Sequence, residues 1–382
     1  MAFDAGFLRA VVWELNRDLA DGKVDKIGQP SADEIVMQIR HFGTTERLLI
    51  RAGASLSRLS LTGENKDNPA TPPMFCMLLR KHLGGAKLLR VEQPGYERVA
   101  RLVFSGYDEM GYETEKYLVA EIMGKYSNLM LLDGHDRILA ALRTVDFSTS
   151  RVRQVLPGMT YELPPAQDKR EPLRETRDGF LAAFAAAAPD TQADKFLIAT
   201  YLGTAVQVAR EIVFRATGRT DTRLFETTAG ALADAFFAWH ECLRDNRYEM
   251  TLTRAADGTP LDYCYAPLTY FGTGTTNETY PDAGALLDAC FGERVRLARL
   301  HNRAADLFGL VERATARLER KTEAQEEELR LARQGEVWQR RGDLLTANLW
   351  RVQRGDAALT TEDFYEDPPV TVTIELDTRL SP

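Results

Sequence analysis

The chain has 382 residues, of which 44% are hydrophobic and 27% charged, and its formal net charge is -8 at pH 7. This length exceeds what one hydrophobic core usually serves, so we expect two or three domains, and the composition is typical of a soluble protein. The acidic balance argues against a generic nucleic-acid binder, which contacts phosphates through Lys and Arg. Residues 51–101, however, hold nine basic and four acidic groups, which leaves room for a local basic patch.

Cysteine usage and the first residues bear on compartment and metal chemistry. The cysteines are too far apart for a zinc site, which needs pairs roughly two to four residues apart. They are Cys76, Cys242, Cys264 and Cys290. Charged residues such as Asp4 interrupt the first apolar positions, and no apolar run approaches a membrane span. We therefore expect a cytoplasmic protein with free thiols, no membrane partner, no metal and no cofactor.

The N-terminal segment predicts one helix followed by a sheet. Residues 4–20 place apolar side chains at helical spacing, with charged and amide side chains elsewhere on the helix. Gly22 ends this helix, and short alternating runs follow at residues 23–30, 34–41, 46–53 and 57–62. Such runs, each bounded by Gly, Pro, Ser or Asn, indicate strands of an antiparallel sheet or sandwich.

A second helix is expected at residues 72–85. Thr71 can cap it, and its first turn accepts prolines because their missing amide hydrogens have no helical partner. The expected buried face consists of Met74, Phe75, Met77, Leu78 and Leu79. The last turn carries Arg80, Lys81 and His82, whose positive charge either complements the helix dipole or binds a polyanion.

Strand patterns return between residues 87 and 142, and one of their turns carries two ionisable groups. Pro94 and Gly95 force a turn that presents Glu97 and Arg98 at its exit. Neighbours on a strand point to opposite faces, so this acid and this base cannot easily pair. One of them is therefore expected to face the sheet as a fixed polar group.

An acid also lies at the end of a strand that should be well covered. Glu121 follows three apolar residues and precedes Ile122 and Met123, and Gly124 then permits a turn beside Lys125. A buried acid needs a partner, which Lys125 or an arginine could supply. Structural pairing explains this acid about as well as a functional role does.

The stretch from 157 to 179 holds four prolines and a run of charges, and its residues 166–179 are expected to form a linker before Ala-rich helices. Residues 196–218 predict two helices around a break at Leu202, Gly203 and Thr204, as in a helix-hairpin-helix unit. The hairpin amides of such units often grip phosphates. Simple packing is an equal interpretation, because Thr204 stands where a second glycine is usual.

The remaining chain predicts a small hairpin, a long helix and a final strand. Asp257-Gly258 is the expected hairpin turn, and residues 370–377 alternate as a strand does. The helix after Gly292 carries an apolar stripe of coiled-coil spacing at Leu300, Ala304, Leu307, Val311, Ala314 and Leu318. Such a stripe needs a partner helix, supplied either by a missing part of the chain or in trans.

Several motifs, spread in order over nearly the whole chain, carry a family resemblance. They are PPMFCMLLRKHL from Pro72, EQPGYERV from Glu92, EIMGKYSN from Glu121, VLPGMTY from Val155, GDLLTANLW from Gly342 and IELDTRLSP from Ile374. With them the chain resembles the NFACT family, whose bacterial members are described as RqcH and fibronectin-binding protein A-like proteins.

The resemblance implies an α+β fold with several domains. An NFACT-N domain at residues 1–165 would be a β-sandwich with helices, like the N-terminal domain of formamidopyrimidine DNA glycosylases. After the linker at 166–179, a helix-hairpin-helix domain with a small β segment would occupy residues 180–290. The first coiled-coil helix would span residues 291–352, and residues 353–382 would form a truncated tip region that contains a strand. The returning helix and a C-terminal RNA-binding domain, NFACT-R, are expected to be missing.

The resemblance also implies a role in ribosome-associated quality control. Family members bind large ribosomal subunits obstructed by peptidyl-tRNA and recruit alanyl-tRNA, so that an untemplated alanine tail is added. The family's Asp-Arg pair, placed against tRNA, falls on Glu97 and Arg98, where Glu reaches one methylene further than Asp. The implied tRNA contacts are Glu97, Arg98, Glu121, Ile122, Met123 and Lys125, with Arg80 and Lys81 as further candidate RNA contacts.

The glycosylase relationship does not imply catalysis. Those enzymes attack with an N-terminal proline and use a nearby glutamate, whereas this chain begins Met1-Ala2-Phe3-Asp4 and has no other catalytic motif. We therefore expect a protein that is not an enzyme, with tRNA and the large ribosomal subunit as partners. The alternatives are a fibronectin-binding surface adhesin, for which the sequence offers no export signal, and a glycosylase-like nucleic-acid-binding protein.

Overall fold

The structure of the protein is a computed structural model that describes residues 3–107 and 110–380, without the side chains of residues 293–307. Residues 1–295 form one compact unit and residues 296–382 a second. The first unit combines a large antiparallel sheet with helices and a smaller sheet. The predicted α+β class is confirmed at this level, while the likeness to glycosylases and the division at residues 165 and 180 stay predictions.

A nine-stranded antiparallel sheet dominates the first unit, in the order β4-β3-β2-β1-β5-β6-β7-β8-β9. Its strands are β1 (Gly22–Ser31), β2 (Glu34–His41), β3 (Thr44–Arg51), β4 (Arg58–Leu61), β5 (Lys87–Glu92), β6 (Val99–Tyr107), β7 (Glu113–Glu121), β8 (Asn128–Leu132) and β9 (Ile138–Ala141). The alternating runs of the sequence therefore did mark strands, because each run supplies apolar residues to at least one buried face and ends at turn residues.

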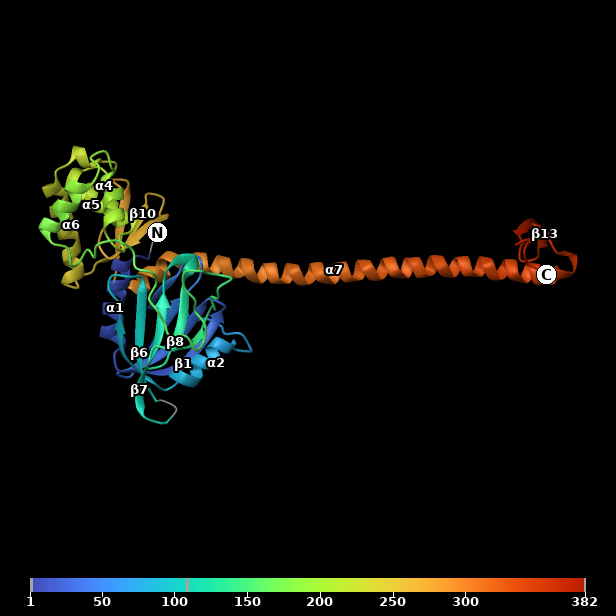
Figure 1. Ribbon diagram of the computed structural model, residues 1–382, viewed down its shortest axis with the longest axis horizontal. Helices are drawn as coiled ribbons and strands as arrows, with labels where there is room; N and C mark the ends of the chain where they lie inside the picture. The colour runs from blue at the N-terminus through green and yellow to red at the C-terminus, as the bar shows by residue number, and fades with distance from the viewer. Residues whose placement is uncertain (1–2, 108–109, 381–382) are drawn as a thin grey trace. The chain divides into compact units, whose positions relative to one another are not determined.

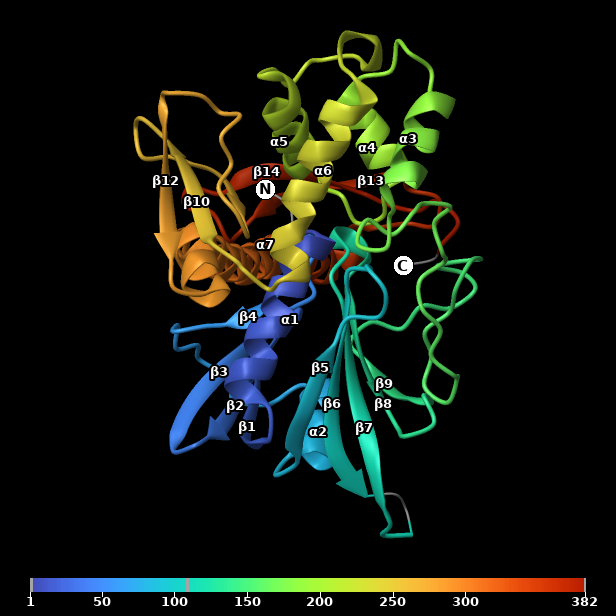
Figure 2. The same cartoon turned by 90° about the vertical axis from the view of Figure 1, so that its left-hand side faces the viewer.

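The sheet divides where β1 meets β5, since these strands pair only at Gly22 with Leu88 and Lys23 with Lys87. Figure 2 shows β1–β4 and β5–β9 as two groups of strands, with α1 (Ala5–Leu19) between them. This helix contacts β2, β4 and β5. It begins as the sequence predicts, because the Asp4 carboxylate accepts a hydrogen bond of 2.7 Å from the Phe7 amide.

The second helix, α2 (Met74–Leu83), differs from its prediction in two respects. Its N-cap is Pro73 rather than Thr71, with no side-chain hydrogen bond to the cap. Met74 and Met77 are exposed, because the buried stripe consists of Phe75, Cys76, Leu79 and Leu83. The prediction counted a nearly continuous run of apolar residues as one buried face. A helix buries a stripe of residues three or four apart, so part of such a run faces solvent.

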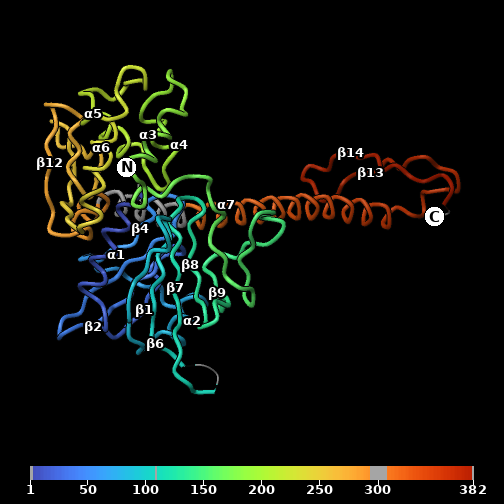
Figure 3. The backbone as a smooth tube through the Cα atoms, turned by 60° about the vertical axis from the view of Figure 1, so that its left-hand side comes forward, coloured from blue at the N-terminus to red at the C-terminus, as the bar shows by residue number. Residues whose placement is uncertain are grey.

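The second part of this unit is mostly helical (Figure 3). Its elements are α3 (Arg177–Ala186), α4 (Ala193–Thr200), α5 (Val206–Thr217), α6 (Ala229–Arg244), β10 (Met250–Ala255), β11 (Pro260–Cys264), β12 (Thr275–Tyr280) and the 3-10 turn Leu224–Glu226. The expected hairpin turn at Asp257-Gly258 joins β10 and β11. The third strand was not expected, because TTNETY is polar and exposed along most of its length and has no apolar alternation.

The break between α4 and α5 lies where the sequence predicts it. Gly203 has a positive φ of 66°, and a Cβ placed on it would lie 2.4 Å from the Ala5 Cβ and 2.8 Å from Tyr96 Cδ1. The hairpin therefore packs closely against the start of α1 and against the turn before β6. A phosphate-binding role for its amides stays a prediction.

The second unit contains the C-terminal part of α7 (Ala283–Ala347), the 3-10 turn Leu349–Arg351 and a hairpin of β13 (Ala358–Asp363) with β14 (Val370–Glu375) (Figure 1). Arg340 of the helix forms ion pairs with Asp363 at 2.7 Å and Glu366 at 2.8 Å. Val311 and Leu318 of the predicted coiled-coil stripe are exposed, while Leu300, Ala304 and Leu307 lie outside the described side chains. Among the described residues, none of the helices has both the length and the apolar character that a bilayer crossing needs.

Candidate functional site

The turn between β5 and β6 presents the first pair of candidate residues. Glu97 and Arg98 belong to this turn and precede β6, so the expectation that they are neighbours on a strand was wrong. The Gln93 side-chain amide donates hydrogen bonds to the carbonyls of Ala5, at 2.9 Å, and Glu97, at 2.8 Å. The turn is thereby fixed to the start of α1, and the adjoining Tyr96 is buried.

The second motif is held directly beside this turn. β6 and β7 pair antiparallel with Val99 opposite Glu121, and the Ile122 amide donates a 2.9 Å hydrogen bond to the Arg98 carbonyl. Two segments more than twenty positions apart in sequence thus form one surface. Both segments could be singled out from the sequence. The strand register that brings them together could not be predicted from it.

Arg98 lies at a cleft of about 560 Å³. The cleft is lined by Phe3, Ala54, Ser55, Leu56, Ser57, Arg98, Ile122, Gly124, Pro260, Leu261, Tyr263 and Phe291. The Arg98 side chain is exposed and makes no hydrogen bond or ion pair with any residue in the described ranges. An unpaired guanidinium beside a cleft is available to a phosphate or to the edge of a base.

Glu121 has a structural partner. Its Oε1 atom lies 2.5 Å from an Arg153 guanidinium nitrogen and accepts a 3.0 Å hydrogen bond from the Tyr161 hydroxyl. The carboxylate is buried, and its partner is an arginine rather than Lys125. Glu121 therefore holds the end of β7 in place, and its direct contact with tRNA stays a prediction that the geometry does not favour.

The carboxylates nearest Arg98 are held in partly or fully buried surroundings. Burial raises the pKa of the half-buried Glu97, and the charges of Arg98 and Lys169 oppose that rise. Burial also raises the pKa of Asp4 to about 7, against the opposing effect of its hydrogen bond from Phe7 and the charge of Arg98. Asp4 and Lys169 were not identified from sequence, because only the folded chain brings them near the turn.

The segment after Ile122 places a cation and an aromatic ring on the surface. Gly124 has a positive φ of 58° and begins the 3-10 turn Gly124–Tyr126. The Lys125 ammonium lies 4.9 Å from the centre of the Tyr126 ring, and both side chains are exposed. Met123 is half-buried, and its amide donates a 2.8 Å hydrogen bond to the Ser127 hydroxyl. An exposed ring beside a cation suits stacking on an unpaired base.

Arg80 and Lys81 do not join this site. The Arg80 Nε donates a 2.7 Å hydrogen bond to the Ile27 carbonyl, and Arg80 lines a different pocket that shares no residue with the Arg98 cleft. Lys81 is exposed and lines neither of these two pockets. The described side chains therefore divide the predicted RNA contacts into two separate groups.

Comparison with known proteins identifies relatives along the whole chain. The protein Rqc2 homolog RqcH of Bacillus subtilis (strain 168) is 30% identical over 383 residues, covering 100% of this chain and 65% of that protein. The chain thus spans about 65% of the length of that relative. Ribosome quality control complex subunit 2 of Schizosaccharomyces pombe is 29% identical over 162 residues, 42% of this chain and 15% of its own length.

A solved structure and a family model agree with this match. The N-terminal part of the fibronectin/fibrinogen-binding protein from Streptococcus suis superposes with a TM-score of 0.64 and 28% identity, covering 76% of this chain and 100% of that chain. The family model described as NFACT N-terminal and middle domains matches residues 4–382. Since the match extends over nearly every residue, the chain belongs to the NFACT family.

Proposed function

We propose that this chain is the tRNA-binding part of a ribosome-associated quality control factor. The observation that carries the proposal is the Arg98 guanidinium, unpaired among the described residues, at a cleft whose lining includes Ile122 and Gly124. A relative named Rqc2 homolog RqcH matches the whole chain, this region included, and a second relative is named ribosome quality control complex subunit 2. The proposed partners are tRNA and a large ribosomal subunit that carries peptidyl-tRNA.

Each surface group would have a distinct role in tRNA binding. Arg98 contacts a phosphate or a guanine edge, and Tyr126 stacks on an unpaired base of a loop. Lys125 adds a phosphate contact, and Glu97 accepts a hydrogen bond from a base amine. Glu121 acts indirectly through its ion pair with Arg153, because that pair fixes the strand end from which this surface projects.

The finer part of the proposal concerns alanine tailing. By its resemblance to the family, the protein would recruit alanyl-tRNA and promote untemplated addition of alanine to stalled chains in the cytoplasm. Peptide transfer would remain the work of the ribosome, so the chain itself would not be an enzyme. The glycosylase-like form of the sheet, the helix-hairpin-helix at α4–α5 and a coiled-coil role for α7 belong to the same proposal.

The test uses the full-length protein that contains this chain. Glu97→Gln combined with Arg98→Gln should abolish alanine tailing and reduce co-sedimentation with obstructed large subunits, because both charged groups of the turn are lost. Arg219→Gln, at an exposed position outside the Arg98 cleft, is the matched control and should leave both readouts unchanged. Unchanged tailing in the double variant, with its thermal midpoint preserved, would refute this site.

A second candidate function follows from the name of a structural relative. The Streptococcus suis protein is described as fibronectin/fibrinogen-binding, so a fibronectin-binding surface protein is the alternative. Cell fractionation separates the two proposals. Protein at the cell surface without ribosome association would favour fibronectin binding, whereas co-fractionation with large subunits would favour quality control.

A further inference from the structure

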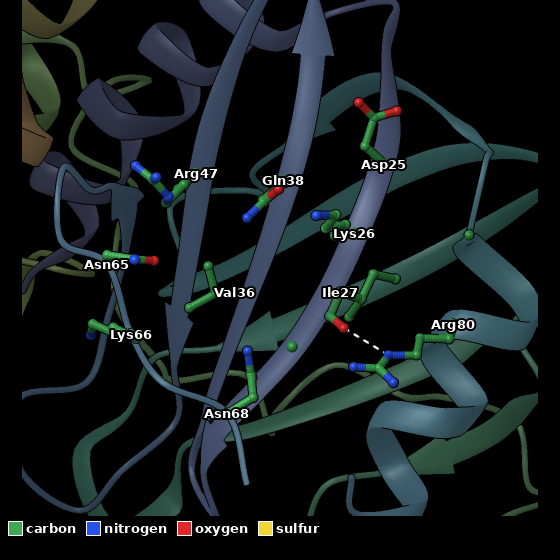
Figure 4. Close-up of a pocket in the computed structure, with 12 residues that line it drawn as sticks. Asp25, Lys26, Ile27, Val36, Gln38, Arg47, Asn65, Lys66, Asn68 and Arg80 are labelled. Atoms are coloured by element: carbon green, nitrogen blue, oxygen red, sulfur yellow. Dashed lines mark hydrogen bonds between the residues drawn. The ribbon is translucent and has the colours of Figure 1, made fainter. Parts of the chain in front are cut away.

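A polar pocket of about 370 Å³ lies on the outer face of β1–β3 (Figure 4). Its walls come from three parts of the chain, namely these strands, the segment around residues 65–68 and the C-terminal half of α2. None of its lining residues belongs to the Arg98 cleft. Its size lies near the lower end of small-molecule sites, which occupy about 300–1,000 Å³.

Three long polar side chains cross this face in one row. Strand pairing places Lys26 opposite Gln38 and Gln38 opposite Arg47, so the two cations flank one amide. Neighbouring strands lie about 4.8 Å apart, which separates the Cα atoms of the two cations by roughly 10 Å. Register fixes this row, because a slip of one residue in any of the three strands would turn its side chain toward the core.

The pocket has uncompensated positive charge. The side chains of Lys26 and Arg47 make no hydrogen bond or ion pair with the residues that the structure describes, and the Arg47 Nε atom is buried without a partner among them. Arg80, fixed by its hydrogen bond to the Ile27 carbonyl, adds a third cation at the rim. A buried guanidinium nitrogen without an acceptor costs free energy, which a bound anion would recover.

Two of the acids near the pocket are already paired. Glu34 lies 2.5 Å from the Lys66 ammonium, and Asp25 lies 3.5 Å from Arg40. The C-terminal end of α2, which reaches the pocket at Gly84, contributes only about half a negative charge. The three cations exceed that charge, so the pocket favours an anion.

The rest of the lining can recognise a flat polar group. Gln38, Asn65 and Asn68 carry amides, each of which both donates and accepts hydrogen bonds. The pocket is narrow at Gly28, because a Cβ placed on this glycine would lie 2.3 Å from the Asn68 Oδ1 atom. Val36 beside it supplies an apolar surface. Amides around an apolar floor match the edges and face of a nucleobase.

We propose that this pocket binds a nucleotide, with its phosphate held by the cations and its base placed against the amides and Val36. The nucleotide is either free or part of a single-stranded RNA, since both offer the same phosphate and base. The proposal does not depend on tRNA binding at Arg98.

Calorimetric titration of the 382-residue chain tests this site. The probes are the four ribonucleoside 5′-monophosphates, each alone, and a mixed-sequence RNA hexanucleotide. The RNA is titrated into the Arg98→Gln variant, so that binding at the cleft is weakened. Binding of at least one monophosphate identifies a free nucleotide as the source, and binding of the hexanucleotide alone identifies RNA.

Two substitutions should each weaken the observed binding about tenfold or more. Lys26→Gln removes a phosphate contact at an exposed position where the fold is not at risk, and Gly28→Val fills the floor without changing charge. Lys23→Gln, on the same strand but outside the pocket, is the charge-matched control and should bind normally. The proposal is overturned if no probe binds at millimolar concentration, or if Lys23→Gln weakens binding as much as Lys26→Gln.

Discussion

Gly203→Ala should destabilise the first unit by about 2–5 kcal/mol. A left-handed residue with a Cβ costs about 1–2 kcal/mol, and overpacking adds about 1–3 kcal/mol where the neighbours cannot move. Here the new Cβ would meet the Ala5 Cβ at 2.4 Å and the Tyr96 carbonyl oxygen at 2.9 Å, and neither is the end of a flexible side chain. The measurement is urea unfolding of both the substituted and the unsubstituted chain.

Gly218→Ala is the matched control for this substitution. Gly218 also has a positive φ, 76°, but no atom of the described residues lies within 4 Å of the position that a Cβ would take there. Gly218→Ala should therefore lose only the backbone contribution of about 1–2 kcal/mol. The excess loss in Gly203→Ala measures how tightly the α4–α5 hairpin holds the turn that carries Arg98. Equal losses in the two variants would show that the close approach is not maintained in solution.

Arg153→Ala should destabilise the protein by about 3–5 kcal/mol, because it leaves the buried Glu121 carboxylate without its ion-pair partner. Among the described residues, the Tyr161 hydroxyl would still donate to that carboxylate, but a neutral donor cannot replace a guanidinium. Urea unfolding at pH 7 measures the loss. Because Glu121 ends the strand that leads to Ile122, tRNA binding should weaken as well.

Two further variants separate the ion pair from general effects of losing an arginine. Arg90→Ala removes exposed ion pairs with Glu92 and Glu115 and should change stability by no more than about 1 kcal/mol. Adding Glu121→Gln to Arg153→Ala removes the stranded charge and should restore part of the lost stability. The account of Glu121 fails if Arg153→Ala costs no more than Arg90→Ala.

Local patterns in the sequence were sufficient for most elements of the sheet and for α1. The strands of the large sheet alternate and end at turn residues, and apolar side chains at helical spacing in residues 4–20 mark the first helix. The polar strands β12 and β13 were missed because their sequences carry no apolar period. The buried faces of helices were predicted less well. Met74 is exposed although it was expected in the core, because a run of apolar residues does not show which of them pack inward.

The candidate site could be named from sequence but not assembled from it. The family motifs identified Arg98 and the segment at Ile122 as candidates. The structure shows that the pairing of β6 with β7 brings them together. Long-range partners had no local signal, so Arg153 as the partner of Glu121 and the nearness of Asp4 to Arg98 were not predicted. The separate pocket at Lys26 and Arg47 likewise depends on strand pairing, which single residues do not reveal.

The most direct test of the central claim is the dissociation constant for tRNA, measured by fluorescence anisotropy at one fixed ionic strength. Arg98→Gln should weaken binding about tenfold or more, because a bidentate contact to a base or phosphate is lost while no hydrogen bond or ion pair to the described residues is broken. Its thermal midpoint should match that of the unsubstituted chain. Arg98→Gln binding tRNA as tightly as the unsubstituted chain would contradict the account.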